Sequence, residues 1–303
     1  MIISTSPKSG TTWMQFIVHL LRTNGTDVGF GEIGEVVPWI DHARELGQNL
    51  NDEQRSSRED GGRPLPFRAF KTHKVQLDAP WLQRRGTAAR PLVPLYIAVL
   101  RDPMDSAWSF YNFGLATHNA APGSVSQRYF FETSVLGRQF NAAAFAAHMV
   151  TLRDRAAASR ALLVFYEDMK EDLPGHVAAV AEFLRHGVPG FDPTPEAVDL
   201  ATQRASFAWM KAHATLFDEH FAWGKLVAPS LQPGPGQQQH ELQLLHPPDK
   251  VVVGRVGDGG ERLVPEVRQL LLRQWAEARP GGAANYAELR TRYGHRIRRG
   301  LPR

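Results

Sequence analysis

The sequence of 303 residues contains no cysteine, which excludes disulfide bonds, catalysis by a thiolate and metal sites built on cysteine. It also lacks an uninterrupted apolar run of about eighteen residues, so no membrane span is predicted. Lys8 and Ser9 interrupt any apolar segment near the start, which argues against a secretory signal peptide. The formal net charge of +4 is a small basic excess that suits an anionic small ligand but is too weak to indicate nucleic-acid binding.

Strand patterns and helix patterns alternate along the chain. Residues 92–100 and 161–165 are near-continuous apolar runs, which are typical of parallel strands buried on both faces. Apolar periodicity predicts helices at 104–113, 142–158, 177–184, 196–202 and 264–278. No internal repeat or domain break appears. We therefore predict one α/β domain over residues 1–303, with a central parallel sheet flanked by helices.

Three segments lack such regular patterns. Residues 227–249 are rich in Pro, Gln and Gly, and this composition predicts a flexible loop. Residues 290–303 are basic and predict a solvated, frayed terminus. Residues 114–140 mix Gly, Ala and Pro with aromatic side chains and show no clear period. A loop of that length inside a compact domain is usually functional or disordered.

Residues 6–13 read Ser-Pro-Lys-Ser-Gly-Thr-Thr-Trp and connect a β-branched run to an apolar-periodic one. This order predicts a strand, a tight P-loop-like turn and a helix. Backbone N–H groups at the helix start, the helix dipole and the ammonium of Lys8 together suit a phosphate-like anion. Taken alone, the stretch could also be an ordinary strand-to-helix turn with a Ser or Thr cap.

The placement of the lysine separates this loop from the P-loop that binds nucleoside triphosphates. In that motif the Lys follows the second Gly and adjoins a hydroxyl that holds Mg²⁺. Here Lys8 precedes Gly10. A P-loop nucleotide kinase is therefore the less favoured alternative within the same fold class.

Polar side chains lie on, or directly after, two other predicted strands. Lys71 and His73 belong to a short strand, and strand alternation puts both on the same face. Arg101 follows the buried strand at 92–100, and Ser109 lies eight residues further on. Ligands of open α/β sheets bind at the carboxyl ends of the strands, so these residues are binding candidates. A structural histidine and an arginine paired with a nearby aspartate are the alternatives.

Five separated segments, in the expected order, resemble the sulfotransferases that use 3′-phosphoadenosine 5′-phosphosulfate (PAPS). The segments are Pro-Lys-Ser-Gly-Thr-Thr-Trp at 7–13, Lys-Thr-His at 71–73, Arg101 with Ser109, Tyr-Glu-Asp at 166–168 and Ser-Phe-x-x-Met-Lys at 206–211. The resemblance spans residues 4–259, and within this family the chain resembles the cytosolic type. It implies a single sulfotransferase-like domain.

The resemblance also implies roles for individual residues. His73 would take the acceptor proton, and Lys8 and Lys71 would neutralise charge on the leaving group. The implied cofactor-binding residues are Lys8, Ser9, Gly10, Thr11, Thr12, Trp13, Arg101, Ser109, Tyr166, Phe207, Arg255 and Gly257.

The chain departs from the family pattern near residue 255. Where the family has Arg-Lys-Gly-x-x-Gly-Asp-Trp, valines stand at 252–253 and Gly259 replaces the Trp. We therefore expect the 3′-phosphate to rest mainly on Arg101 and Ser109, with Arg255 as a third contact. The family's C-terminal dimerisation segment has no match here, which leaves the oligomeric state open.

The implied reaction is transfer of the sulfonate from PAPS to a hydroxyl or amine of a small apolar or phenolic acceptor, in the cytoplasm. A transferring sulfonate bears less negative charge than a phosphoryl group, and the sequence offers no Asp/Glu/His cluster, so we expect no metal. The alternative from a different class is a non-catalytic protein that binds PAPS or its product, 3′-phosphoadenosine 5′-phosphate (PAP). Val252 and Val253 favour that alternative, whereas the intact set of Lys8, Lys71 and His73 opposes it.

The first predicted strand begins almost at Met1, whereas members of the family usually carry an upstream segment that helps to cover the sheet. We therefore expect an open sheet edge or pocket mouth at residues 1–5.

Overall fold

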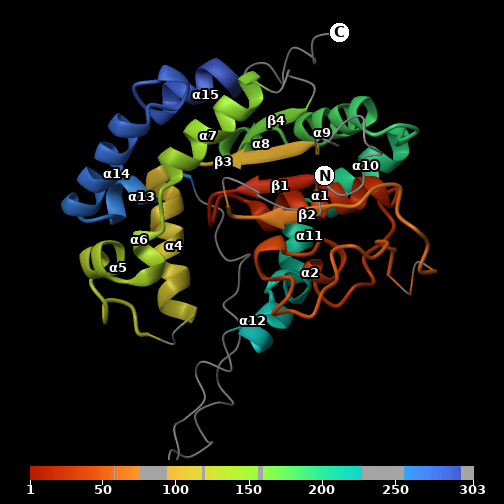
Figure 1. The fold of residues 1–303 in the computed structure, drawn as a ribbon, viewed down its shortest axis with the longest axis horizontal. Helices are drawn as coiled ribbons and strands as arrows, with labels where there is room; N and C mark the ends of the chain where they lie inside the picture. The colour runs from red at the N-terminus through yellow and green to blue at the C-terminus, as the bar shows by residue number, and fades with distance from the viewer. Residues whose placement is uncertain are drawn as a thin grey trace, which may run out of the picture.

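Four parallel strands form a central sheet in the computed structural model, which describes residues 1–57, 59, 61–74, 94–117, 120–155, 160–226 and 256–294 (Figure 1). The strands are β1 (Ile2–Thr5), β2 (Phe70–Thr72), β3 (Tyr96–Leu100) and β4 (Ala161–Phe165). Their spatial order is β2-β1-β3-β4, and each adjacent pair is parallel. All the strands therefore end at the same edge of the sheet, as predicted for an α/β domain.

Helices account for most of the remaining regular structure. They are α1 (Thr11–Arg22), α2 (Ile33–Val36), α4 (Pro103–Thr117), α5 (Gln127–Thr133), α6 (Val135–Arg138), α7 (Ala142–Arg155), α8 (Tyr166–Glu171), α9 (Leu173–Gly187), α10 (Pro195–Arg204), α11 (Phe207–Ala212), α12 (His220–Leu226), α13 (Asp258–Arg262), α14 (Pro265–Ala278) and α15 (Tyr286–Gly294). Short 3-10 helices are η1 (Ile40–His42), η2 (Ala214–Phe217) and η5 (Pro280–Gly282). No helix in the described ranges is both long and apolar enough to cross a membrane.

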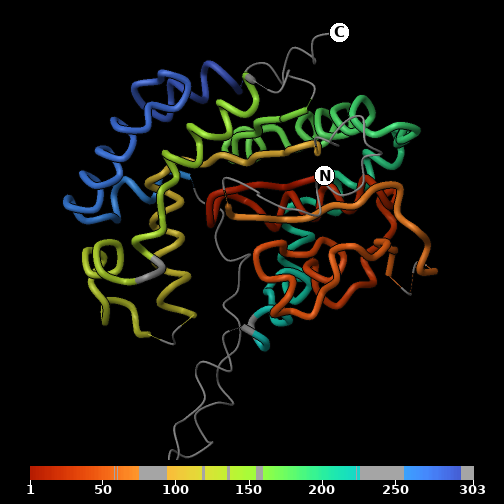
Figure 2. The backbone as a smooth tube through the Cα atoms, viewed as in Figure 1, coloured from red at the N-terminus to blue at the C-terminus, as the bar shows by residue number. Residues whose placement is uncertain are grey.

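The strand β1 runs through the interior of the sheet, between β2 and β3, and Figure 2 shows it at the centre of the molecule. Ile2 and Ile3 are fully buried. The expectation of an open sheet edge at residues 1–5 is therefore wrong. The edges belong to β2 and β4, because β1 pairs on both sides.

Alternate side chains of the strands enter two separate cores. Ile97 and Val99 pack with α1, α9 and α10, whereas Ala98 and Leu100 pack with α7, α14 and α15. This alternation follows from the two-residue period of a strand. Helices therefore cover both faces of the sheet, and its carboxyl edge is the region left for a ligand.

The segment 114–140, predicted to be an irregular loop, is largely helical. Helix α4 continues to Thr117, and α5 and α6 follow. Phe130 and Phe131 join Phe110 in a third apolar cluster, so aromatic packing stabilises short helices whose sequence has no clear period. The prediction failed because it relied on periodicity alone.

The described part of the predicted frayed terminus, residues 290–294, is helical, and residues 295–303 lie outside the described residues. Arg290 belongs to α15 and forms ion pairs with Asp168 and Glu171 of α8. These carboxylates fix a segment whose basic composition had suggested solvation. The predicted loop at 227–249 lies outside the described residues.

A buried polar network fixes the segment before β2 to the end of α1. The guanidinium of Arg22 donates to Gln54 Oε1 and to the carbonyl oxygens of Val36 and Phe67. Asp27 Oδ2 accepts a hydrogen bond from Ser57 N at 2.7 Å and lies 3.1 Å from His19 Nε2. The network holds the chain that leads to β2.

The charge of Asp27 is stabilised within this network. Burial by itself would raise the pKa of Asp27, but hydrogen bonds from His19 and Ser57 outweigh that effect and hold the pKa well below its usual range. A carboxylate with a depressed pKa in the folded state stabilises the fold above its unfolded pKa, and this contribution is lost as the pH falls through the folded pKa.

We therefore expect Asp27→Asn to lower the free energy of unfolding at pH 7 by about 3 kcal/mol, because it leaves buried donors without their anionic partner. Urea unfolding measures this, and the difference from wild type should shrink as the pH falls below about 4. The control Asp199→Asn, on the exposed side of α10, should change stability by less than about 0.5 kcal/mol. Equal stabilities for wild type and Asp27→Asn at pH 7 would show that the network does not hold this segment.

Candidate active site

The loop between β1 and α1 has the backbone of an anion-binding turn. Lys8 and Gly10 have positive φ angles of 63° and 98°, and Gly10 is the N-cap residue of α1. A Cβ atom at Gly10 would lie 3.0 Å from the ring of Tyr166, so glycine suits both the conformation and the space. The first N–H groups of α1 have no partner within the helix and are available to an anion. The predicted strand–loop–helix is confirmed.

Three predicted segments meet at this loop. The guanidinium of Arg101, at the end of β3, donates to the carbonyl oxygen of Lys8 at 2.9 Å. It also lies 4.4 Å from the ring centroid of Tyr166. The ammonium of Lys8 lies 4.3 Å from the ring centroid of Phe113 on α4. The structure therefore brings Lys8, Arg101 and Tyr166 together at the carboxyl edge of the sheet.

The imidazole of His73 is held against the end of β1. Its Nδ1 lies 3.0 Å from the carbonyl oxygen of Thr5. A carbonyl oxygen can only accept, so the hydrogen sits on Nδ1, and Nε2 keeps its lone pair. The Oγ1 atoms of Thr5 and Thr11 are 2.5 Å apart, which connects this strand end to the first residue of α1. His73 therefore lies at the end of β1, just before the anion loop, with its hydrogen on Nδ1.

The electrostatic surroundings keep His73 neutral. Desolvation lowers the pKa of the ring to about 4, and the ammonium of Lys71 acts in the same direction. The hydrogen bond to Thr5 and the carboxylates of Glu219 and Asp41 oppose these effects only in part. At neutral pH the ring is therefore uncharged.

Lys71 is deeply buried beside His73. Its ammonium forms an ion pair with Glu219, which precedes α12, and lies 4.2 Å from the ring centroid of Trp39. The side chain of Lys71 is only 3% exposed. Glu219 has a positive φ of 61°, an unusual conformation for a residue other than glycine. The carboxylate that pairs with Lys71 thus belongs to a residue in the left-handed backbone region.

Asp41 binds the residues around His73, although the sequence indicated no role for it. Its carboxylate accepts hydrogen bonds from Trp39 Nε1 at 2.9 Å, Thr72 Oγ1 at 2.8 Å and His73 N at 2.9 Å. These bonds fix the end of β2 and the indole next to it. The only available signal was an acidic residue two positions after a tryptophan, which is too common to interpret.

The aromatic residues among the implied cofactor contacts, Trp13, Tyr166 and Phe207, lie on three helices, α1, α8 and α11. Trp13 donates from Nε1 to the carbonyl oxygen of Ala205 at 2.8 Å, and its ring faces Tyr166 edge-on at 5.7 Å. The ring of Phe207, at the start of α11, is 38% exposed and lies 5.2 Å from Lys170 Nζ. Within the described residues, the rings of Trp13 and Phe207 do not pair with each other.

The remaining predicted cofactor contacts are described only in part. Ser109 is half-buried two turns into α4. The amide of Gly257 donates to Asp105 Oδ2 at 2.8 Å, so it is already used within the protein. Arg255, Val252 and Val253 lie outside the described residues.

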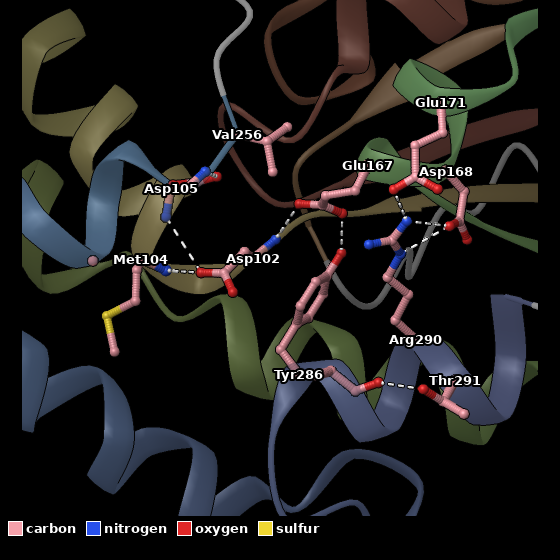
Figure 3. Close-up of a pocket in the computed structure, with 13 residues that line it drawn as sticks. Asp102, Met104, Asp105, Glu167, Asp168, Glu171, Val256, Tyr286, Arg290 and Thr291 are labelled. Atoms are coloured by element: carbon pink, nitrogen blue, oxygen red, sulfur yellow. Dashed lines mark hydrogen bonds and ion pairs between the residues drawn. The ribbon is translucent and has the colours of Figure 1, made fainter.

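A pocket of about 590 Å³ lies between α4, α8, α13 and α15 (Figure 3). Its carboxylates are engaged by the protein itself. Glu167 accepts from Asp102 N and Tyr286 Oη, while Asp168 pairs with Arg290. In the described part of the chain, no group of three or more histidine or acidic side chains is arranged to hold a metal ion.

The sequence is similar to those of known sulfotransferases. The sulfotransferase domain family matches residues 1–225. Sulfotransferase 1E1 of Mus musculus is 29% identical over 211 residues, which cover 70% of this chain and 65% of that protein. Sulfotransferase 1C2 of Homo sapiens is 30% identical over 215 residues, with the same coverage of 70% and 65%. The chain thus spans just under two thirds of the length of the curated relatives that it matches.

Solved structures show the same fold. Retinol dehydratase in complex with androsterone and the inactive cofactor PAP aligns over 92% of this chain and 80% of its own, with a TM-score of 0.56 and 16% identity. Mouse sulfotransferase SULT7A1 complexed with PAP aligns over 97% and 88%, with a TM-score of 0.52 and 18% identity. Because the domain match covers most of the sequence, the chain belongs to the sulfotransferase domain family.

Proposed function

We propose that this protein transfers the sulfonate group of PAPS to a hydroxyl or amine of a small acceptor. The observation that carries the proposal is the position of His73, whose Nδ1 faces the carbonyl oxygen of Thr5 while Nε2 remains a proton acceptor next to the anion loop. Family membership and the PAP complexes of structures with this fold support the choice of donor.

Residues of the anion loop would bind the donor. Lys8 and the N–H groups at the start of α1 would hold the 5′-phosphosulfate, and Trp13 and Phe207 would contact the adenine. Arg101 and Ser109 would bind the 3′-phosphate. The cationic groups among them would place positive charge where negative charge accumulates on the leaving phosphate, and electrostatic stabilisation of this kind is usually the largest single contribution to catalysis.

His73 would act on the acceptor. Its Nε2 would remove the proton of the acceptor hydroxyl as the oxygen attacks sulfur, while the bond from sulfur to the leaving phosphate oxygen breaks. Lys71 would donate from its ammonium to the same leaving oxygen. It would then share its charge between that oxygen and Glu219, its partner in the structure.

The segment beside His73 supports an apolar or phenolic acceptor. The ring of Trp39 lies 5.4 Å from that of His73 and packs edge-on against His42 at 4.5 Å. Structures of similar fold were solved with androsterone and with retinol, both apolar alcohols. The resemblance to the cytosolic type of the family supports a cytoplasmic location.

A second candidate is a protein that binds PAP or PAPS without transferring the sulfonate. The ion pair of Lys71 with Glu219 favours it, because a lysine committed to a carboxylate stabilises a leaving group less well. Labelled PAPS with a panel of phenols, sterols and amines separates the two candidates. Transfer to any acceptor supports the enzyme, whereas binding of PAPS without transfer supports the second candidate.

We expect His73→Ala to lower the transfer rate by about 10²- to 10⁴-fold, the usual loss on removal of a general base. PAP binding, measured by calorimetry, should remain within about threefold of wild type, because Nε2 acts on the acceptor. His186→Ala, a change of an exposed histidine on α9, is the control and should leave both properties unchanged. A His73→Ala variant with half the wild-type rate would remove His73 from the reaction.

The charges beside His73 should move its pKa in opposite directions. Lys71→Met removes a neighbouring cation and should raise the pKa of His73 above about 4, whereas Glu219→Gln removes an anion and should lower it. Since only the neutral ring accepts a proton, the acidic limb of the transfer rate should move to higher pH in Lys71→Met. NMR titration of the imidazole measures both shifts, with Glu53→Gln as the exposed control. Shifts of the same sign in both variants would contradict this account.

A further inference from the structure

A chain of hydrogen bonds leads from the C-terminal helix α15 to the backbone of the anion loop. The hydroxyl of Tyr286, on α15, donates to Glu167 Oε2, and Glu167 Oε1 accepts from Asp102 N at 3.0 Å (Figure 3). Asp102 directly follows Arg101 in the sequence. The guanidinium of Arg101 donates to the carbonyl oxygen of Lys8 at 2.9 Å. The position of a tyrosine outside the loop is therefore transmitted to the loop itself.

We propose that Tyr286 is a positioning residue that holds the anion loop in the conformation that binds the 5′-phosphosulfate group. Through Glu167 it fixes the backbone at residue 102, and with it the guanidinium that holds the carbonyl oxygen of Lys8. The inference rests on the proposed function and deepens it. It extends the donor site to a helix beyond residues 1–225, the part of the chain that matches the family model.

The loop needs support from outside because of the backbone conformation of Lys8. Its φ of 63° lies in the left-handed region, which a residue other than glycine adopts only when surrounding contacts compensate the cost. The peptide group between Lys8 and Ser9 is held on both sides. Its carbonyl oxygen accepts from Arg101, and its N–H donates to the carbonyl oxygen of Ser6 at 3.3 Å. Since a peptide group is planar, these two bonds together fix the turn that precedes α1.

Arg101 projects from a backbone that is fixed by its neighbours. The N–H of the next residue, Asp102, is bound by Glu167, and the Asp102 carboxylate accepts from Met104 N at 2.8 Å in the first turn of α4. The guanidinium itself lies 4.4 Å from the ring centroid of Tyr166. Glu167 therefore sets the position of the backbone from which the guanidinium reaches the loop.

Glu167 in turn depends on Tyr286 for the hydrogen bond to its second oxygen. The residue is 3% exposed, and burial raises its pKa, whereas hydrogen bonds from Asp102 N and from the Tyr286 hydroxyl oppose this effect. Burial and the charge of Glu167 raise the pKa of Tyr286 well above its usual value, so the hydroxyl keeps its hydrogen and donates. The ring centroid of Tyr286 lies 5.9 Å from that of Phe165 and 6.1 Å from that of Trp275. Loss of the hydroxyl alone would leave this ring packing in place.

Adenosine 5′-phosphate is the probe that tests the inference, because it carries the 5′-phosphate that the loop would bind and lacks the 3′-phosphate. Tyr286→Phe should weaken its binding by about three- to tenfold in calorimetric titration, the usual effect of one hydrogen bond. Tyr293→Phe is the matched control, because Tyr293 lies on the same helix and its hydroxyl binds Asp154, whose side chain is exposed. The control should leave the affinity unchanged.

Two further sets of variants separate positioning from a general loss of stability. Glu167→Gln keeps an acceptor for Asp102 N and should stay within about threefold of wild type, whereas Glu167→Ala should lose about tenfold in affinity. Arg101→Met removes the bond to the loop and should by itself weaken binding of adenosine 5′-phosphate. Adding Tyr286→Phe to Arg101→Met should cause no further loss, because the chain of hydrogen bonds is then already broken.

The inference is overturned if Tyr286→Phe lowers the free energy of unfolding but keeps the wild-type affinity, or if its loss and that of Arg101→Met add. Where Tyr286→Phe does not fold, Arg101→Met decides, and an unchanged affinity for adenosine 5′-phosphate in that variant overturns the inference as well. Failure of the proposed function looks different, because wild type itself would then bind neither adenosine 5′-phosphate nor PAP.

Discussion

The hydrogen bond between His73 Nδ1 and the carbonyl oxygen of Thr5 joins the ends of β2 and β1, and the candidate site is built around it. It sets the tautomer of the ring, so that Nε2 can accept a proton. It also places the ring beside the loop that begins immediately after Thr5. The bond depends on β1 lying next to β2 in parallel register, with Ser4 opposite Thr72. Sheet pairing therefore sets the orientation and tautomer of His73 in this protein.

Three carboxylates also contact groups that are distant in the sequence and fix the parts of the candidate site. Asp41 fixes the end of β2, Glu219 holds the ammonium of Lys71, and Asp105 holds the backbone near Gly257. Each carboxylate compensates a buried donor or cation that would otherwise destabilise the fold. In this chain the negative groups thus position the positive ones and the backbone, while the candidate anion-binding groups belong to the loop and to Arg101.

Local patterns were sufficient for the parts of the structure that local interactions determine. The loop from Lys8 to Trp13 follows from small residues between a β-branched run and an apolar-periodic run, and the parallel sheet follows from buried strands that alternate with helices. The contact of Lys71 with Glu219 spans 148 positions, and that of Asp105 with Gly257 spans 152. No pattern in the sequence specifies such pairs, because they arise only when the strands are ordered and the helices packed. The helices within 114–140 were missed for the related reason that their stability comes from aromatic packing.

The most direct measurement of the central claim is a crystal structure of the protein with PAP bound. We predict the 5′-phosphate at the N–H groups of residues 9–12 with the ammonium of Lys8 in contact, and the adenine between Trp13 and Phe207. Nε2 of His73 should face the position that the sulfonate would occupy, while Nδ1 keeps its bond to Thr5. A nucleotide bound away from the loop, or a His73 ring turned so that Nε2 faces Thr5, would contradict the account.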